Sequence, residues 1–443
     1  MKYNNQIIAA IDIGTTKIVA LAGRRNQQGK FEILGFASVP SKGVKRGIVL
    51  NIEDAVQSIR NAVEKASQPS GLSLNEVFVG IAGQHIKSTK SRSSISLESF
   101  DTEISAKDIN ELTDKIYQMA LGPGEEILHV IPQTYIVDKE VGIKNPIGMS
   151  GNKLEGNFHV VIGMVASANN IKKCVNRVGI TVNSLILEPL ASAASVLTED
   201  EKEVGVALVD IGGGTTDVAV FYDGMIKHTA VIPLGGNVVT SDIKQAFTIL
   251  ERQAEELKKQ YGSAIQEKAK EEVVISVPGL KGRKPRELPL NNLSYIIQAR
   301  MEEILHAVMF QIENSGYKDK LGAGIVLCGG GALLKNLRQL SSFITGIDVR
   351  IGYPNEHLDD TAIDDINQPQ FATSIGLLMK GLEFVEETEK TNQEMFMNLD
   401  KNEPEDTEET ENDEEDENIE RHSIFDKLKT KVSRLFDEED SNF

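Results

Sequence analysis

One pattern occurs twice in this sequence, as Ile11-Asp12-Ile13-Gly14-Thr15-Thr16-Lys17 and as Val209-Asp210-Ile211-Gly212-Gly213-Gly214-Thr215-Thr216-Asp217. Each copy follows one apolar run and precedes another, which predicts a strand, a tight turn and a second strand. Glycine in such a turn lets backbone N–H groups approach an anion closely, because no Cβ stands in the way. The repetition predicts two related domains that close on one polyphosphate from opposite sides.

A third glycine-rich stretch, residues 324–337, predicts a buried strand, the turn Gly329-Gly330-Gly331 and the start of a helix. Such a turn lets a phosphate or a flat base lie against the backbone. The Rossmann fingerprint is excluded because its third glycine would fall at Leu334, and no strand is followed by a Walker A loop. The order of the three stretches resembles the actin-like ATPase superfamily, which also contains the sugar kinases and the seventy-kilodalton heat-shock chaperones.

The resemblance to actin-like ATPases implies ATP and Mg²⁺ as ligands. Asp12 and Asp210 would hold the metal through its water shell, and Asp210 would also be a catalytic residue. Lys17 would neutralise phosphate charge. The phosphates would be held by Gly14, Thr15, Thr16, Gly212, Gly213, Gly214, Thr215 and Gly236, and the base would lie on Gly330, Gly331 and Ala332. We expect ATP binding with at most slow hydrolysis, because two phosphate loops can serve a conformational switch without fast turnover.

Glu188, in Leu187-Glu188-Pro189-Leu190-Ala191, has two interpretations. It matches the carboxylate that positions water in actin-like ATPases, and would then be catalytic. An acidic residue in the first turn of a helix is also stabilised by the helix dipole alone. The sequence leaves both interpretations open.

A long helix is predicted from Ser241 to about Gly262, because apolar residues recur at helical spacing along it. Glu255 and Lys258 lie three positions apart on one face of this helix, where a solvated ion pair is the plain interpretation. The segment also resembles the nucleotide-clamping helix of bacterial actin homologues. By that resemblance Glu255 would hold the ribose hydroxyls and Lys258 would lie against the base.

Composition limits the classes of function. Aromatic residues make up 5% of the 443 residues and Trp is absent, so stacking platforms for single-stranded nucleic acid are not expected and no nucleic-acid partner is predicted. Cys174 and Cys328 lie in apolar segments and are expected to be buried thiols, and no metal-binding spacing occurs among the Cys and His residues. The N-terminus leads into a strand without a secretory segment, which predicts a cytoplasmic protein.

We expect an α/β fold of the duplicated, two-lobed actin-like (ribonuclease H-like) type, since 443 residues exceed one simple core. Residues 1–83 and 163–200 would form the first subdomain. Residues 84–162, where Ser, Thr and turn clusters become common, would be a subdomain inserted into it. Residues 201–385 would form two further subdomains and return to the first at the end.

The C-terminal residues have a different character. Residues 386–420 hold 17 acidic and 2 basic residues, which predicts a disordered linker of net charge −15. Residues 421–443 follow with a predicted amphipathic helix, whose apolar residues fall within an arc of about 120° at helical spacing. A helix of this kind binds an anionic membrane surface, and docking on a partner or on the protein's own body is the alternative. The residues expected at the membrane are Ile424, Phe425, Leu428, Val432, Leu435 and Phe436, edged by Lys427, Lys431 and Arg434.

Taken with the loops and the insertion, this tail resembles the FtsA family of bacterial cell-division proteins. Support comes from the turn at residues 233–242, similar to the family's Gly-Gly-x-x-x-Thr-x-Asp turn, and from residues 368–378, similar to its closing helix. The resemblance implies self-assembly into filaments, anchoring of the tubulin-like FtsZ ring through the FtsZ C-terminal tail, and recruitment of other division proteins by the inserted subdomain. It places the protein peripherally on the cytoplasmic face of the membrane, at the division site.

Three rival functions have the same superfamily background. A small-molecule kinase needs a catalytic base and a polar substrate pocket, and the sequence shows no such constellation. A chaperone needs a peptide-binding domain, for which the chain after residue 385 has no room. A PilM-like scaffold for pilus assembly shares the fold and the membrane periphery, though it typically grips a membrane partner instead of carrying its own helix.

Overall fold

The computed structural model describes residues 6–68, 71–97, 99, 101–268, 273–279, 284–359 and 365–400. The chain divides into two units, Met1–Thr388 and Glu389–Phe443. The helices and strands belong to the first unit, except that one helix continues into the second. The predicted membrane-binding residues 421–443 lie outside the described residues.

The first sheet contains the first glycine loop. Its order is β11-β6-β1-β2-β3, from Thr181–Leu187, Glu76–Ile81, Ile8–Ile13, Lys17–Arg25 and Phe31–Pro40. The strands β1, β2 and β3 pair antiparallel, whereas β6 and β11 run parallel to β1. Residues 14–16, which we call loop one, join β1 to β2.

The second sheet repeats this arrangement. Its order is β14-β13-β12-β17-β18, from Met225–Ile232, Thr216–Tyr222, Val206–Ile211, Ile325–Cys328 and Val349–Ile351. Again the first three strands pair antiparallel and the last two run parallel to the first. Loop two, residues 212–215, occupies the place of loop one, so the predicted duplication is visible in the order and direction of the strands.

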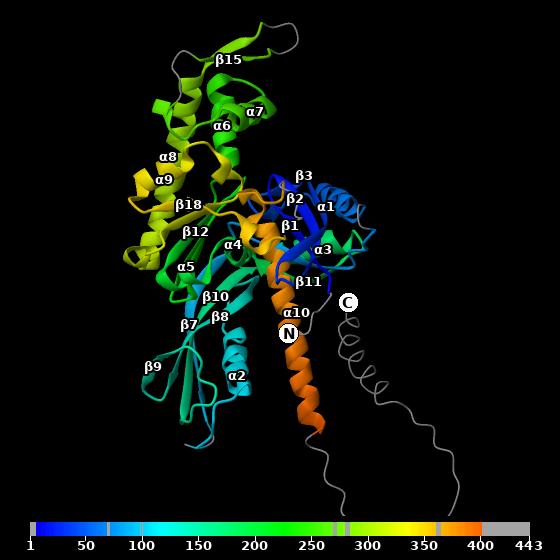
Figure 1. Ribbon diagram of the computed structural model, residues 1–443, viewed down its shortest axis with the longest axis vertical. Coiled ribbons are helices and arrows are strands. Elements are labelled where there is room, and N and C mark those ends of the chain that lie inside the picture. The colour runs from blue at the N-terminus through cyan, green and yellow to red at the C-terminus, as the bar shows by residue number, and fades with distance from the viewer. Residues whose placement is uncertain are drawn as a thin grey trace, which may run out of the picture. The chain divides into compact units, whose positions relative to one another are not determined.

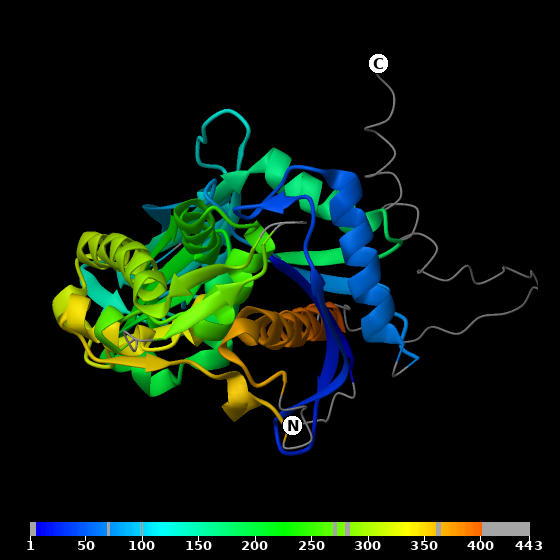
Figure 2. The same cartoon turned by 90° about the horizontal axis from the view of Figure 1, so that it is seen from above.

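Both sheets are covered on both faces, which explains the apolar runs before each loop. In β1, Ile11 and Ile13 pack towards α1 (Ile52–Ser67) and α3 (Val165–Asn176), while Ile8 and Ala10 pack towards α10 (Ala372–Asp400). Figure 2 shows α1 and α10 on opposite sides of this sheet. Asn51 caps α1 by accepting a hydrogen bond from the Asp54 N–H, which fixes where the helix begins.

The second sheet is covered in the same way. Alternate β12 residues face α8 (Leu290–Ser315) on one side and α4 (Glu188–Val196) on the other. The helix α4 follows directly from β11 of the first sheet. Consequently α4 carries the chain from one sheet to the other.

The inserted subdomain is a four-stranded antiparallel sheet of order β7-β10-β8-β9 with one helix. Its elements are β7 (Lys87–Ser96), α2 (Ala106–Tyr117), β8 (Glu125–Val137), β9 (Glu140–Ile143) and β10 (Lys153–Met164). Leu112, Leu154 and Phe158 lie in a separate core between helix and sheet. The subdomain also touches the second sheet, because Ser88 and the His159 ring each hydrogen-bond Thr229 in β14.

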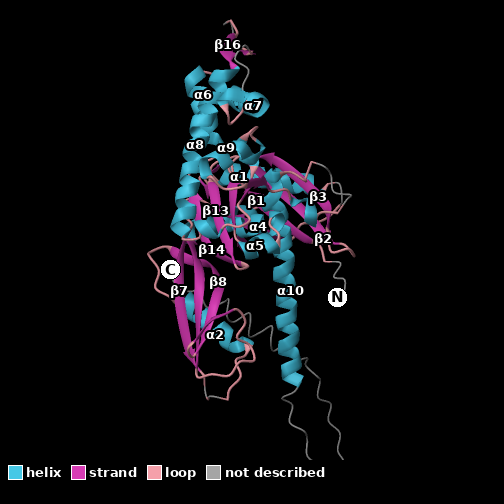
Figure 3. Ribbon diagram, turned by 60° about the vertical axis from the view of Figure 1, so that its left-hand side comes forward, coloured by secondary structure: helices cyan, strands magenta, loops and turns pink. Residues whose placement is uncertain are grey.

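The predicted long helix 241–262 is wrong in one respect, since the structure has two helices there. Helix α6 (Gly236–Phe247) ends at Thr248, whose left-handed φ of 51° stops it, and α7 (Glu251–Tyr261) begins after Leu250. Figures 1 and 3 place α6, α7 and the hairpin of β15 (Val274–Val277) and β16 (Arg286–Pro289) at the opposite end of the first unit from the inserted subdomain.

The expected disordered linker, residues 386–420, needs correction in its first part, because α10 continues to Asp400, whereas residues 401–420 lie outside the described residues. Acidic side chains are good helix formers, and the helix is already nucleated by its packed first turns. Among the described residues, no helix combines the length and apolar character needed to cross a membrane. The remaining elements are β4 (Val44–Lys45), β5 (Ile48–Val49), α5 (Glu199–Val204) and α9 (Leu337–Thr345), with short 3₁₀ turns between them.

Candidate functional site

A cavity of about 840 Å³ lies where the two glycine loops meet. It is bordered by loop one, loop two, the third turn at residues 329–331, and helices α6 and α7. The structure brings together every nucleotide-site residue predicted from the sequence except Ala332, which is buried in the core of the second sheet. The lining includes Asp12, Gly14, Thr15, Thr16, Lys17, Glu188, Asp210, Gly212, Gly213, Gly214, Thr215, Gly236, Glu255, Lys258, Gly330 and Gly331.

The two loops lie directly against each other. A Cβ added at Gly213 would stand 2.3 Å from Cγ2 of Thr16, and one at Gly214 would stand 2.6 Å from Oγ1 of Thr15. Any side chain at either glycine would therefore push loop one away. The glycines of loop two are needed for this close approach as much as for exposing backbone N–H groups.

Four carboxyl groups converge on one wall of the cavity, from Asp12, Glu188, Asp210 and Asp217. Burial raises the pKa of Glu188 well above its usual range, and the charges of the three aspartates add to this effect. Burial and the neighbouring Asp210 raise the pKa of Asp217 to about 8. Burial also raises the pKa of Asp12, although Lys17 and a hydrogen bond from Ser374 oppose the shift.

Lys17 supplies a positive charge beside these acids. Its Nζ donates to the backbone oxygen of Gln370 and lies 4.1 Å from the centre of the Phe371 ring. Burial lowers the pKa of Lys17 to about 8, against the opposing effect of Asp12 and Asp210. The amine is therefore largely charged at neutral pH and is placed to meet a phosphate.

A hydrated magnesium ion fits this wall. The Oδ1 atom of Asp217 is buried without a hydrogen-bond partner in the described structure, and carboxylate oxygens are the ligands that Mg²⁺ prefers. No group of three His, Cys, Asp or Glu residues in the described ranges has the geometry to hold a metal directly. Mg²⁺ usually keeps several of its waters, so contact through water is the arrangement that suits these carboxylates.

Glu255 and Lys258 face the other side of the cavity and form one network with α6. The Lys258 ammonium lies 2.7 Å from the Glu255 carboxylate and donates to the Gly236 backbone oxygen and to Oγ1 of Thr240, at 2.8 Å each. Burial alone would raise the pKa of Glu255, but Lys258, Thr240 and Lys259 together lower it. The pair is thus partly buried and turned into the cavity, which disfavours the interpretation as a solvated ion pair.

Sequence reasoning missed several lining residues. Asp217 ends the second motif and pairs with Asp210 across β12 and β13, and the sequence alone assigns it no role. Asn237, Lys259, Lys335, Gln370 and Thr373 also line the cavity. Gln370 lies in the 3₁₀ turn Pro369–Phe371 and Thr373 at the start of α10, more than 350 residues from loop one, and no local signal marks them.

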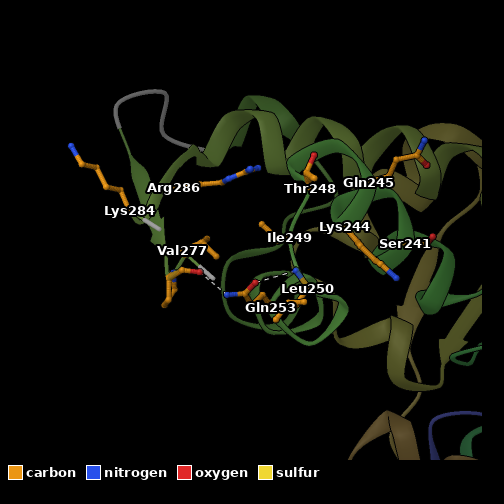
Figure 4. A pocket seen from close by; sticks show the side chains of 12 residues that line it. Ser241, Lys244, Gln245, Thr248, Ile249, Leu250, Gln253, Val277, Lys284 and Arg286 are labelled. Carbon is orange, nitrogen blue, oxygen red and sulfur yellow. Dashed lines mark hydrogen bonds between the residues drawn. The ribbon is translucent and has the colours of Figure 1, made fainter. Parts of the chain in front are cut away.

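A second cavity, of about 580 Å³, lies between α6, α7 and the β15–β16 hairpin. Figure 4 shows Lys244, Lys284 and Arg286 around it, with Ile249, Leu250 and Val277 between them. The Gln253 side chain holds the rim together by accepting from the Leu250 N–H and donating to the Pro278 oxygen. Lys244 pairs with Glu251 at 3.0 Å, and Lys284 and Arg286 add further positive charge to the rim around the apolar interior.

The duplicated sheets, the paired glycine loops and the cavity between them define an actin-like protein. The solved structures agree: the PilM–PilN type IV pilus biogenesis complex matches with a TM-score of 0.62 at 15% identity, over 84% of this chain and 98% of that chain. A structure of MreB 5 of Spiroplasma citri bound to AMPPNP matches with a TM-score of 0.50 at 16% identity, over 88% and 99%.

The sequence comparisons identify the family. The family model described as "Cell division protein FtsA" matches residues 207–376. The model described as "SHS2 domain inserted in FTSA" matches residues 83–162. The cell division protein FtsA of Pseudomonas aeruginosa is 42% identical over 380 residues, covering 86% of this chain and 90% of its own. Those of Neisseria meningitidis and Escherichia coli K12 are 38% and 36% identical, covering 85% and 86% of this chain and 91% of their own. The chain belongs to the FtsA family of cell-division proteins.

Proposed function

We propose that this cell-division protein binds Mg·ATP between the two glycine loops and uses it as a conformational switch. The observation that carries this proposal is the cavity bordered by both loops, since each loop belongs to a different sheet and one polyphosphate would hold the two together. The likeness to a structure of MreB 5 bound to AMPPNP adds support from the fold. Lys17 would pair with the phosphates, Asp12 and Asp210 would hold the hydrated Mg²⁺, and Glu255 with Lys258 would meet the nucleoside.

Hydrolysis would be slow, and Glu188 supplies the physical reason. A general base must be unprotonated to accept a proton from water. Burial and the charges of three aspartates raise the Glu188 pKa well above its usual range, which disfavours the unprotonated form that a general base needs. A bound Mg²⁺ would lower this pKa by adding positive charge, which makes ATP turnover dependent on metal loading.

Replacement of Asp210 by Ala tests the nucleotide site. Titration with a fluorescent ATP analogue in Mg²⁺ should show binding by the unchanged protein and a large loss of affinity in the variant. The exposed Asp101→Asn variant serves as the matched control for removal of a carboxylate. Equal affinities in all three proteins would mean that the two-loop site is wrong.

At the level of the cell, we propose that the protein forms filaments on the cytoplasmic face of the membrane and links FtsZ to it. Membership of the FtsA family supports this role, and the amphipathic pattern of residues 421–443 supplies a means of attachment. Removal of residues 421–443 should abolish sedimentation with anionic liposomes while ATP binding persists. Unchanged sedimentation would contradict attachment by this segment.

The second cavity offers a surface for the FtsZ C-terminal tail. Its cationic rim and apolar interior suit a peptide that carries both acidic and apolar side chains. The double variant Lys244→Glu with Arg286→Glu should lose capture of a FtsZ C-terminal peptide, whereas Lys65→Glu on the exposed end of α1 should keep it. Undiminished capture by the double variant would mean that FtsZ binds another surface. The inserted subdomain, which we propose to bind other division proteins, would then be tested next.

The alternatives predict different products and partners. A small-molecule kinase would phosphorylate a member of a panel of sugars in the presence of ATP. A PilM-like scaffold would not capture FtsZ, and it would sediment with liposomes only when a membrane partner is present. Absence of phosphorylated product together with FtsZ capture supports the proposal over both.

A further inference from the structure

The 3₁₀ turn Pro369–Phe371 and the start of α10, which follows it, contact the third turn and the strands that flank both glycine loops. The Pro369 backbone oxygen accepts from the Gly329 N–H of the third turn at 3.0 Å, and the Gln370 oxygen accepts from Lys17 after loop one. Two consecutive side chains, Thr373 and Ser374, then reach the carboxylates on either side. Four residues of one segment thus contact elements of both sheets.

The two hydroxyl contacts go to different sheets. The Ser374 hydroxyl donates to Oδ2 of Asp12 at 2.7 Å, at the end of β1. The Thr373 hydroxyl donates to Oδ2 of Asp210 at 3.1 Å, at the end of β12. Oγ of Ser192, on α4, lies 2.9 Å from the same Asp210 oxygen and 2.8 Å from Oγ1 of Thr373. Each hydroxyl has one proton, so two of these three contacts are hydrogen bonds at one time, and at least one hydroxyl always donates to Asp210.

This turn of α10 is held firmly in place by α4. A Cβ added at Gly376 would stand 1.7 Å from the backbone oxygen of Ala191, so the two helices cross in backbone contact. One turn earlier, Ser195 donates to the Ala372 oxygen at 2.7 Å. The crossing therefore fixes the backbone that carries both hydroxyls.

We propose that Thr373 and Ser374 are positioning residues, which hold Asp12 of the first sheet and Asp210 of the second at the separation required by the water shell of Mg²⁺. The proposal rests on the nucleotide site proposed above. A carboxylate offers about four acceptor sites on its two oxygens, so a hydroxyl at Oδ2 leaves capacity for metal-bound water. Because the donors are neighbours on one helical turn, the two carboxylates keep their spacing only while both sheets stay against α10.

The test separates the metal from the nucleotide. The affinity for a fluorescent ATP analogue is measured in Mg²⁺ and again in EDTA, and the ratio of the two affinities reports the contribution of the metal. Loss of a group that orients a metal-binding residue typically costs about 10–100-fold, so Ser374→Ala should reduce this ratio by about that factor. Thr373→Val should reduce it less, because Ser192 still donates to Asp210.

Two further variants keep the test decisive. Thr373→Ser retains the hydroxyl and should keep the ratio of the unchanged protein. Thr388→Ala removes an exposed hydroxyl from the same helix, where it donates to the Phe384 oxygen, and should also leave the ratio unchanged. If Ser374→Ala does not fold, the comparison of Thr373→Val with Thr373→Ser carries the test.

The outcomes distinguish this inference from the nucleotide site itself. An unchanged ratio in Ser374→Ala and Thr373→Val would overturn the positioning role, as would an equal loss of affinity in Mg²⁺ and EDTA. Absence of nucleotide binding in the unchanged protein would instead overturn the proposed function.

Discussion

Replacement of Asp217 by Asn should remove part of the pH dependence of stability. Asp217 is buried beside Asp210, and its Oδ2 accepts only a long hydrogen bond, 3.3 Å, from the Thr215 hydroxyl. These surroundings raise its pKa from 3.8 to about 8. Asn keeps the shape and the hydrogen-bond acceptor but cannot ionise.

The direction of the effect follows from where the proton is bound. Between pH 3.8 and about 8, the folded protein holds a proton on Asp217 that the unfolded chain has released. A rise in pH therefore favours the unfolded chain, by at most about 1.4 kcal/mol per pH unit for one proton. From pH 5 to pH 7 the side chain lowers the free energy of unfolding by about 3 kcal/mol, and Asp217→Asn should not show this loss.

Urea unfolding of the nucleotide-free protein at pH 5, 6 and 7 measures the effect. The curves of the unchanged protein and Asp217→Asn should diverge as the pH rises, with the variant more stable at pH 7. Asp101→Asn, at an exposed position, should follow the unchanged protein. Parallel curves for Asp217→Asn and the unchanged protein would refute the reasoning, because Asp217 would then ionise alike in both states.

Three other predictions concern the same region. Gly376→Ala should lower the thermal unfolding midpoint, because its methyl group would meet the Ala191 oxygen at 1.7 Å. Overpacking costs about 1–3 kcal/mol, which exceeds the gain in helix propensity of about 1 kcal/mol. A raised midpoint would contradict this. Gly213→Ala should weaken ATP binding by separating the loops, as measured by titration with the fluorescent ATP analogue. The second change Thr16→Ser removes the facing methyl and should restore binding in that titration. ATP affinity should fall as the pH rises past about 8, where Lys17 loses its charge, and Lys17→Arg should be flat over this range; an equal decline in both would exclude Lys17 as the cause.

The nucleotide loops could be predicted because their chemistry is local. Apolar strands that flank Gly14 and Gly213 specify both the sheet interior and the turn, so the fold and the phosphate-binding backbone are encoded in the same few residues. The position of Glu255 and Lys258 was predictable for the same reason, since their spacing places them on one helical face. The helix that carries them was predicted too long, because a left-handed residue such as Thr248 has no reliable sequence signal.

The remainder of the site depends on contacts between distant segments. Thr373 and Ser374 acquire their role only because α10 crosses α4 and returns to the loops, and neither residue type is unusual at the start of a helix. The raised pKa of Asp217 likewise depends on Asp210, which pairs with it across β12 and β13, and on burial by other elements. Propensity could not show that α10 extends to Asp400, because a strongly acidic composition is compatible with a helix once packing has started it.

The contact between loop one and loop two has a consequence for kinetics. Thr16 and Gly213 leave no room for even a methyl group between them, so a nucleotide bound as proposed would have no exit past this point while the sheets stay together. Parting of the two sheets should therefore speed its release. In the filament proposed above, a neighbouring subunit that holds the two sheets together should lengthen the residence time of the nucleotide.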